Sequence, residues 1–502
     1  MRTRQPSEER SSRGEQNPAD LLSTTAAGPA AVRGGGMRGI GFLVGALASA
    51  ASAALLFRHL GVIDTGRYVA ILSLVAIVSG FSDLGLTAVG VREAATREGD
   101  ERAPLLRELL GLRLTLTLGG VVIVAGVAAF LYPSVYIAGV AIAGVGLLLQ
   151  VTQDNYSVLL QVELRLGWVA MLDMLRQLST ALFVVLLVLA GAKLLAFVAV
   201  TVAVGLVCVT VAAQLVRGRR SLAPAFHWAQ WRPMIAAILP YSAAVAAAAL
   251  YFRMAILLTS LLANGYQLGL FSASFRIVEF LTVIPALLAG AALPIFSHAA
   301  RDDLNRLGYA LGRVFEVALI VGCWIAVSLA VGASLAIAII GGHRFAGAAG
   351  VLQILGVALV GTFATAVWGN GLLSLRRHGD LLTITVSALV ISAALIAALI
   401  ELDGAIGAAI GLAAGEVGMA VATGTILARR SDELRPSLRI VPLVGMASAV
   451  ALTPMLATGV PVIVRLAVST ILYAVVLLLT RALPPELDAL LPAGVVRRLA
   501  SR

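Results

Sequence analysis

Three ionisable side chains lie inside two long apolar stretches in the middle of the chain. Arg253 falls in the stretch 234–262, and Arg276 and Glu279 fall in the stretch 268–296. An ionisable group at bilayer depth costs roughly 2.5–3.5 kcal/mol on insertion scales, so such groups usually face a bundle interior or a water-filled cavity. The two stretches are therefore predicted to form one wall of a solvated cavity.

These residues also have plain structural explanations. Arg276 and Glu279 are three positions apart, so on a helix they could simply neutralise each other. Arg253 lies toward one end of its stretch, and its long side chain could reach the membrane surface instead.

Glu416 lies in the middle of the apolar stretch 405–428 with no basic residue nearby. It is the best single candidate for a titrating site, and a hydrogen-bonded structural role is the alternative.

The composition is typical of a membrane protein. Sixty per cent of the residues are apolar and 13% are charged. The apolar residues occur in runs of about 20, the length that crosses a bilayer core as a helix. The net charge of +11 comes almost entirely from arginines scattered over short loops, which indicates membrane orientation rather than nucleic-acid binding. Cys208 and Cys323 both fall inside apolar runs and predict neither a disulfide nor a thiolate metal site.

The sequence predicts an all-α polytopic fold with about fourteen transmembrane helices. Nearly all loop arginines fall on the side of the N-terminus, and only Arg58, Arg67, Lys193 and Arg344 lie opposite. This bias places both termini in the cytoplasm. The predicted spans are 37–57, 66–89, 109–132, 135–156, 168–190, 194–216, 234–262, 268–296, 314–340, 348–373, 381–400, 405–428, 440–457 and 460–480.

A weak internal repeat relates the second and eighth spans. Shifting the chain by 203 positions places Gly66 over Gly269, with a helix, a Gly-aromatic turn and a second helix in both copies. An even number of spans separates the copies, which predicts two six-helix lobes related by a pseudo-two-fold axis along the membrane normal, with a substrate between them. The expected units are a disordered tail 1–36, an N-lobe 37–220, a linker 221–232, a C-lobe 233–430, two further helices within 431–482, and a C-terminal tail 483–502.

The sequence shows no obvious catalytic motif. It contains no GxxxxGK[ST] or HExxH motif, and its five histidines are widely spaced. All predicted outer loops are short, whereas membrane glycosyltransferases and polymerases often carry a large one. We therefore expect no catalytic residue, no metal site and no cofactor, and we do not expect an enzyme.

Several short motifs resemble those of a known family. The segment 60–95, with Asp83-Leu-Gly-Leu86 and Val91-Arg-Glu93, is similar to the second-helix signature of the polysaccharide flippase family. That family belongs to the multidrug/oligosaccharidyl-lipid/polysaccharide exporter superfamily. The segment 270–294 and Val162-Glu-Leu-Arg165 are similar to further patterns of the family. Ala255 is a departure, because members commonly carry an acidic residue there, so that residue's role in ion coupling does not carry over.

The resemblance implies translocation of a polyprenyl-diphosphate-linked oligosaccharide by alternating access across a bacterial cytoplasmic membrane. A guanidinium group pairs with phosphate oxygens at two points, so Arg253 and Arg276 are the candidates for the diphosphate. Arg58 and Arg67, at the outer mouth, could receive or release the headgroup. Protons or sodium ions would drive the cycle, and other polysaccharide assembly proteins are candidate partners.

The remaining charged residues are candidates for coupling or gating. Glu279 and Glu416 belong to this group, as do Asp83 and Arg92 near the inner end of the second span and Asp154 at the inner end of the fourth. Loop anchoring is the alternative for Asp83 and Arg92, and a packing or interfacial contact is the alternative for Asp154.

Other functions stay open at this point. A peptidoglycan lipid-precursor flippase is discriminated poorly by the sequence. A multidrug exporter of the same superfamily would be expected to have an acidic, aromatic cavity for cations, whereas arginines in the seventh and eighth spans favour an anionic cargo. A scaffold of a polysaccharide assembly complex and a membrane glycosyltransferase are the less favoured alternatives.

Overall fold

The computed structural model describes residues 27–83, 85–97, 101–217, 223–457 and 459–482. Every regular element in these ranges is a helix, so the predicted all-α fold is confirmed. The α-helices are α1 (Ala27–Asp83), α2 (Leu86–Ala95), α3 (Arg102–Leu131), α4 (Ser134–Val162), α5 (Leu166–Leu189), α6 (Leu194–Val216), α7 (Trp228–Leu262), α8 (Gly265–Leu281), α9 (Val283–Asp302), α10 (Leu304–Ile340), α11 (Ala348–Ser374), α12 (His378–Arg430), α13 (Ile440–Ala451) and α14 (Val462–Leu479).

Two helices are long enough to cross a membrane twice, because each contains a break. Gly61 interrupts α1 with a φ of 74°, and Asp403 and Gly404 interrupt α12, the latter with a φ of 55°. Glycine adopts positive φ without the steric penalty of a Cβ. Both breaks fall between predicted spans. Eleven described helices are long and apolar enough to span a bilayer, and the segment Ile440–Leu456 is a shorter apolar helix.

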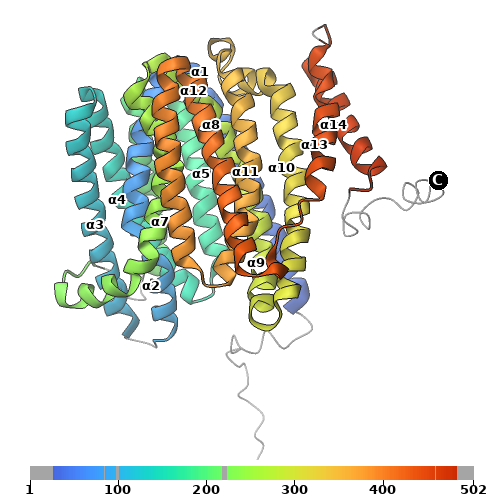
Figure 1. The fold of residues 1–502 in the computed structure, drawn as a ribbon. Helices are drawn as coiled ribbons and strands as arrows, with labels where there is room; N and C mark the ends of the chain where they lie inside the picture. The colour runs from blue at the N-terminus through green and yellow to red at the C-terminus, as the bar shows by residue number, and fades with distance from the viewer. Residues whose placement is uncertain (1–26, 84, 98–100, 218–222, 458, 483–502) are drawn as a thin grey trace, which may run out of the picture.

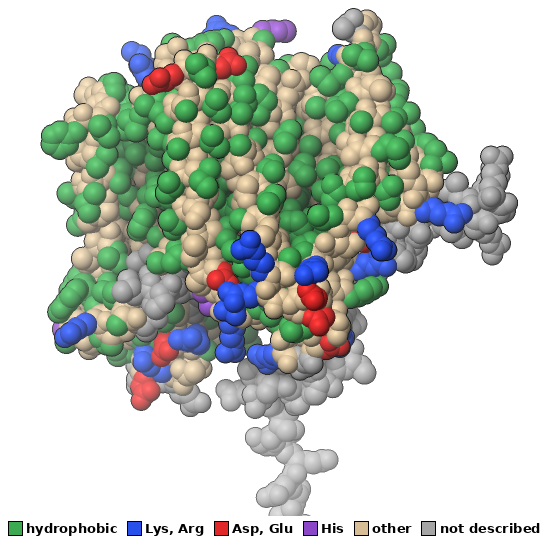
Figure 2. Space-filling model, viewed as in Figure 1, with side chains coloured by type: hydrophobic (Ala, Val, Ile, Leu, Met, Phe, Trp, Pro, Cys, Tyr) green, Lys and Arg blue, Asp and Glu red, His purple; other side chains and the backbone are tan. Residues whose placement is uncertain are grey.

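The helices form one bundle, with α13 and α14 at one edge (Figure 1). Hydrophobic side chains cover much of its flank, and many of the basic side chains visible in Figure 2 lie near one end. We call the end that carries α2 the lower end, as drawn, and the opposite end, which carries the turn His343–Phe345, the upper end.

Helix packing divides along the chain, with α1 as the link. In the first half, α4 packs against α3 and α6, while α5 packs against α1. In the second half, α11 packs against α10 and α12, and α12 packs against α7. Helix α1 also contacts α7 and α8, so it runs along the junction where the expected lobes would meet. The lobe boundaries 37–220 and 233–430 stay a prediction.

Two boundaries predicted from the sequence are wrong. Helix α1 begins at Ala27, so the last ten residues of the expected disordered tail 1–36 are helical. Pro29 falls in the first turn, where proline is tolerated, and the segment extends an existing helix without a new nucleus. Helix α7 begins at Trp228, inside the expected linker 221–232, because Trp231 is buried against residues of α3 and α4. Residues 1–26 and 483–502 of the two expected tails lie outside the described residues.

Candidate functional site

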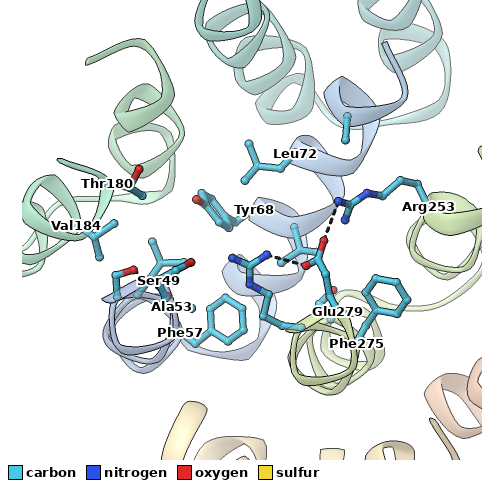
Figure 3. Close-up of a pocket in the computed structure, with 16 residues that line it drawn as sticks. Ser49, Ala53, Phe57, Tyr68, Leu72, Thr180, Val184, Arg253, Phe275 and Glu279 are labelled. Atoms are coloured by element: carbon cyan, nitrogen blue, oxygen red, sulfur yellow. Dashed lines mark hydrogen bonds and ion pairs between the residues drawn. The ribbon is translucent and has the colours of Figure 1, made fainter. Parts of the chain in front are cut away.

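A cavity of about 230 Å³ lies where α1 meets α5, α7 and α8 (Figure 3). Both halves of α1, before and after the break at Gly61, contribute residues to the wall of this cavity. Its charged lining residues are Arg253, Arg276 and Glu279, the three that the sequence placed at one cavity wall.

One carboxylate holds both arginines. Arg253 Nη2 donates to Glu279 Oε1 at 2.8 Å, and Arg276 Nη1 donates to Glu279 Oε2 at 2.6 Å. We call these three residues the arginine trio. Two guanidinium groups against one carboxylate leave one net positive charge, so Arg276 and Glu279 do not simply cancel. Because Arg253 points to Glu279 inside the bundle, the alternative that it reaches the membrane surface is wrong.

Local structure explains this arrangement. Arg276 and Glu279 share one face of α8 because residues three apart are neighbours on a helix. Arg253 reaches them from α7. Each guanidinium group also lies over an aromatic ring, Arg253 over Phe252 at 5.1 Å and Arg276 over Phe280 at 4.8 Å. Such contacts stabilise a cation by about 0.5–2 kcal/mol.

The trio retains unused donors. A guanidinium group has five N–H donors, and each arginine uses one nitrogen on Glu279. The side chains of Arg253 and Arg276 are 22% and 34% exposed. They therefore remain accessible from the cavity, and an anion placed there could accept several charge-assisted hydrogen bonds.

Two further cavities continue from the first toward the lower end. The second, of about 290 Å³, shares Tyr68, Leu72, Ala76 and Thr180 with the first. The third, of about 460 Å³, shares Ser79 and Gln153 with the second. The second half of α1 lines all three, so the series runs from the arginine trio to the level of Asp83, the last residue of that helix.

A second charged group borders the second and third cavities, with Arg176 in the wall of the second and Asp83, Arg113 and Asp154 in the wall of the third. Arg113 Nη2 donates to Asp83 Oδ1 at 3.0 Å, and Arg176 Nη2 donates to Asp154 Oδ1 at 3.2 Å and also to Gln153. We call these two ion pairs the paired cluster. The Arg113 side chain is only 3% exposed. The sequence indicated Asp83 and Asp154 as candidates, and Arg113 was missed. Its presence as an arginine inside the predicted apolar span 109–132 is the signal that could have identified it.

The other predicted residues lie outside the three cavities. Arg58 donates to the carbonyls of Ala338 and Ile339 at the end of α10, at 3.0 and 2.8 Å. Arg67 pairs with Asp64 at 3.0 Å, and both side chains are about 40% exposed. Arg92, in α2, is 72% exposed and lies 3.5 Å from Glu93.

Glu416 occupies a separate place in the second half of the chain. It is in the second half of α12 and accepts a hydrogen bond from the Thr362 hydroxyl of α11 at 2.9 Å. It lines none of the three cavities.

Near the upper end, the backbones of α1 and α8 approach each other closely. A Cβ on Gly66 would lie 2.8 Å from the Gly269 nitrogen, and a Cβ on Gly269 would lie 2.1 Å from the Val62 carbonyl oxygen. Only glycine permits this approach. These are the two glycines that the predicted repeat aligns, and they meet each other. Phe57 stacks on Phe345 near the same end, with ring centroids 6.3 Å apart.

Within the described ranges, no three His, Cys, Asp or Glu side chains are grouped closely enough to hold a metal ion. The site therefore consists of guanidinium groups, carboxylates and neutral hydrogen-bonding groups along the cavities. Binding and release of an anionic, hydrogen-bonding ligand is the chemistry that this set can perform.

The chain is a polytopic helical bundle with ionisable residues around an internal cavity, and structural comparison shows which known proteins share this fold. The chain matches lipid II flippase MurJ in an inward closed conformation with a TM-score of 0.72 at 10% identity, covering 88% of this chain and 97% of that one. It matches an inward-facing multidrug resistance MATE transporter of the MOP superfamily with a TM-score of 0.64 at 14% identity, covering 78% and 95%. These likenesses show the shared fold.

A third structural match is a MOP superfamily transporter from Pyrococcus furiosus Vc1 (DSM3638), with a TM-score of 0.54 at 15% identity and coverage of 80% and 94%. The sequence model of the family described as "Polysaccharide biosynthesis protein" matches residues 55–349, more than half of the chain. The chain belongs to this family, and the resemblance stated from the sequence is confirmed. No curated protein gives a significant sequence match.

Proposed function

We propose that this protein is a flippase that moves a polyprenyl-diphosphate-linked oligosaccharide across a bacterial cytoplasmic membrane. The observation that carries the proposal is the arginine trio, which presents one net positive charge and unused donors to a cavity inside the bundle. A diphosphate-sugar headgroup cannot cross hydrocarbon unaided, whereas its lipid tail has no need to leave the bilayer. The protein therefore has to supply a polar, cationic passage for the headgroup alone.

In this proposal the diphosphate binds Arg253 and Arg276. Phosphate oxygens accept from guanidinium nitrogens at two points, which a lysine ammonium cannot reproduce. Glu279 holds both guanidinium groups in place when the site is empty and gives up part of its hydrogen bonding when the diphosphate arrives. Arg58 and Arg67 would receive or release the headgroup at the outer mouth only after the upper end opens. In the conformation described, Arg58 instead donates hydrogen bonds to carbonyls at the end of α10.

Alternating access is the proposed cycle. The glycine contact closes the upper end, and the cavities run toward the lower end, which the loop arginines predict to be cytoplasmic. The conformation described is then inward-facing. Asp83 and Asp154 belong to the inner gate through the paired cluster, and Arg92 lies on the exposed helix beside it.

Ion coupling is assigned to Glu416. Its carboxylate lies between α11 and α12, away from the headgroup cavities. Protons or sodium ions are the candidate coupling ions. Replacing Glu416 by Gln should leave headgroup binding unchanged and remove any stimulation of flipping by a proton or sodium gradient; stimulation that persists would exclude this assignment.

Two alternative cargoes remain within the same fold. A peptidoglycan lipid precursor has a related diphosphate headgroup, and the MurJ-like fold is compatible with it. Export of cationic drugs is disfavoured by the positive charge of the arginine trio, because a cation would have to bind against it. Proteins that assemble polysaccharides are the candidate partners.

The test is reconstitution. Purified protein in liposomes that contain a fluorescent polyprenyl-diphosphate glycan should move the lipid between leaflets faster than protein-free liposomes do. Transbilayer movement at the protein-free rate would favour the non-transporting scaffold, and transport of organic cations instead would favour the multidrug exporter.

A further inference from the structure

We propose that the second cavity is the binding subsite for an uncharged sugar, the one linked directly to the diphosphate. This inference rests on the proposed function and specifies its substrate. It starts from position, because the second cavity opens from the first through four shared lining residues, which are Tyr68, Leu72, Ala76 and Thr180. A glycan attached to a diphosphate at the arginine trio can extend into this space.

The wall of the second cavity offers neutral hydrogen-bonding groups that are not used by the protein. Tyr68, Ser79 and Gln150 line it, and none of the three side chains has a hydrogen-bond partner within the described part of the chain. Hydroxyl and carboxamide groups each donate and accept, which matches the hydroxyl groups of a sugar. None of their polar atoms is among the buried atoms without a partner, so these groups face the cavity and are free to form hydrogen bonds with a ligand that enters it.

The rest of the wall is apolar, as in most binding pockets for small molecules, where few polar groups fix the orientation. Leu72, Val75, Leu147 and Val204 are examples. Tyr68 belongs to both cavities, and Figure 3 shows its ring pointing into the space beside Thr180. The ring therefore lies at the junction between the proposed diphosphate site and the proposed sugar site.

The charges around this cavity favour an uncharged sugar over an acidic one. Arg176 is the cation of its wall, and it already donates to Asp154 and Gln153. The third cavity below is lined by the carboxylates of Asp83, Asp154 and Asp173 and by one arginine, Arg113. A sugar carboxylate would find no excess positive charge there, and it would be repelled.

Binding to three synthetic lipids tests the subsite. The probes are polyprenyl diphosphate, its hexosyl derivative and its hexuronosyl derivative, with affinities measured on the full-length protein in nanodiscs. Neutral hydrogen bonds contribute about 1 kcal/mol each, or about fivefold in affinity. We expect the hexosyl lipid to bind at least about tenfold tighter than polyprenyl diphosphate, and the hexuronosyl lipid to bind more weakly than the hexosyl lipid.

The variant Gln150→Leu with Ser79→Ala should bring the affinity ratio of hexosyl lipid to polyprenyl diphosphate close to one. Gln214→Leu is the matched control, because Gln214 is exposed on α6 and lines none of the three cavities, and it should keep the wild-type ratio. If the double variant does not fold, Gln150→Glu provides a second test of the same subsite, read from the affinities of the two glycosyl lipids. It adds a carboxylate to the subsite and should weaken the hexuronosyl lipid about fivefold relative to the hexosyl lipid.

Three results would overturn the subsite while leaving the flippase proposal intact. They are equal wild-type affinities for polyprenyl diphosphate and its hexosyl derivative, a hexosyl ratio that survives the substitutions, and tighter binding of the hexuronosyl lipid than of the hexosyl lipid. If the wild-type protein binds none of the three lipids, the proposed function itself fails and the subsite fails with it.

Discussion

Two groups of arginines and carboxylates lie along the same series of cavities and differ in charge balance. In the arginine trio, Arg253 and Arg276 share the single carboxylate of Glu279, and all three side chains are 21–34% exposed. In the paired cluster each arginine has its own carboxylate, and Arg113 is 3% exposed. The trio therefore presents unused positive charge to a cavity, whereas the cluster neutralises its charge inside the protein.

This difference in charge balance assigns ligand binding to the arginine trio and a stabilising role to the paired cluster. A buried cation that loses its partner is strongly destabilising, so the paired cluster ties α1 to α3 and α4 to α5. A partly solvated cation with spare donors can exchange a protein carboxylate for a ligand phosphate at much lower cost. Substitutions in the trio should thus affect ligand binding, and substitutions in the paired cluster should affect stability.

The largest effect is expected from removing both guanidinium groups of the trio. Arg253→Ala with Arg276→Ala should weaken binding of polyprenyl diphosphate by a hundredfold or more, since hydrogen bonds to charged groups contribute about 1.5–3 kcal/mol each. Arg377→Ala with Arg429→Ala removes two exposed arginines elsewhere and should change affinity little. Equal losses in the two double variants would mean that only overall charge matters.

The next effect concerns stability. Asp83→Ala leaves Arg113 buried without its carboxylate and should lower the free energy of unfolding by about 3 kcal/mol, which appears as a lower melting temperature in detergent. Asp432→Ala, which breaks an exposed pair with Arg435, should have almost no effect. A melting temperature for Asp83→Ala equal to that of the wild type would remove the structural role given to the paired cluster.

A smaller effect of opposite sign is expected at Glu279. The substitution Glu279→Gln removes the carboxylate that competes with the diphosphate, so the affinity for polyprenyl diphosphate should rise by about tenfold. Glu279→Asp retains the charge and should bind close to the wild-type level. Weaker binding by Glu279→Gln would show that the positioning of the guanidinium groups by Glu279 outweighs its competition with the diphosphate, and would contradict this prediction.

The smallest expected effect is a shift in which end of the bundle is open. In a background with Cys208 and Cys323 replaced by Ala, a cysteine introduced by Ser49→Cys reports access to the cavity of the trio. Adding Gly269→Ala places a Cβ against the Val62 carbonyl oxygen and should raise labelling from the upper side by a membrane-impermeant thiol reagent several-fold. Gly126→Ala, with open space around it, is the control. Unchanged labelling would show that the glycine contact does not close the upper end.

The trio was predictable from the sequence because ionisable residues are rare in apolar spans and have few places to lie. The positions of the membrane spans were also predictable. Hydropathy limits where each span can begin and end, and the charges of the loops limit which side each loop lies on. The aligned glycines Gly66 and Gly269 identified the helices that meet at the upper end, although not their direct contact. That contact depends on helix rotation and separation, which the spacing of glycines does not specify.

Other features depended on contacts between distant segments. The pairing of Arg113 with Asp83 depends on how α3 is rotated against α1. The engagement of Arg58 with the end of α10 joins residues about 280 positions apart. Trp231 extends α7 into the expected linker because it finds a buried site made by α3 and α4, which local sequence cannot indicate.

The central claim is that Arg253 and Arg276 carry the diphosphate through the bundle. The direct measurement is the flipping rate of a fluorescent polyprenyl-diphosphate glycan in liposomes that contain the wild type, Arg253→Ala/Arg276→Ala or Arg253→Lys/Arg276→Lys at matched protein density. The account predicts fast flipping by the wild type, the protein-free rate for the alanine variant and an intermediate rate for the lysine variant, which keeps the charge but loses the two-point geometry. Wild-type flipping by a correctly inserted alanine variant would contradict it.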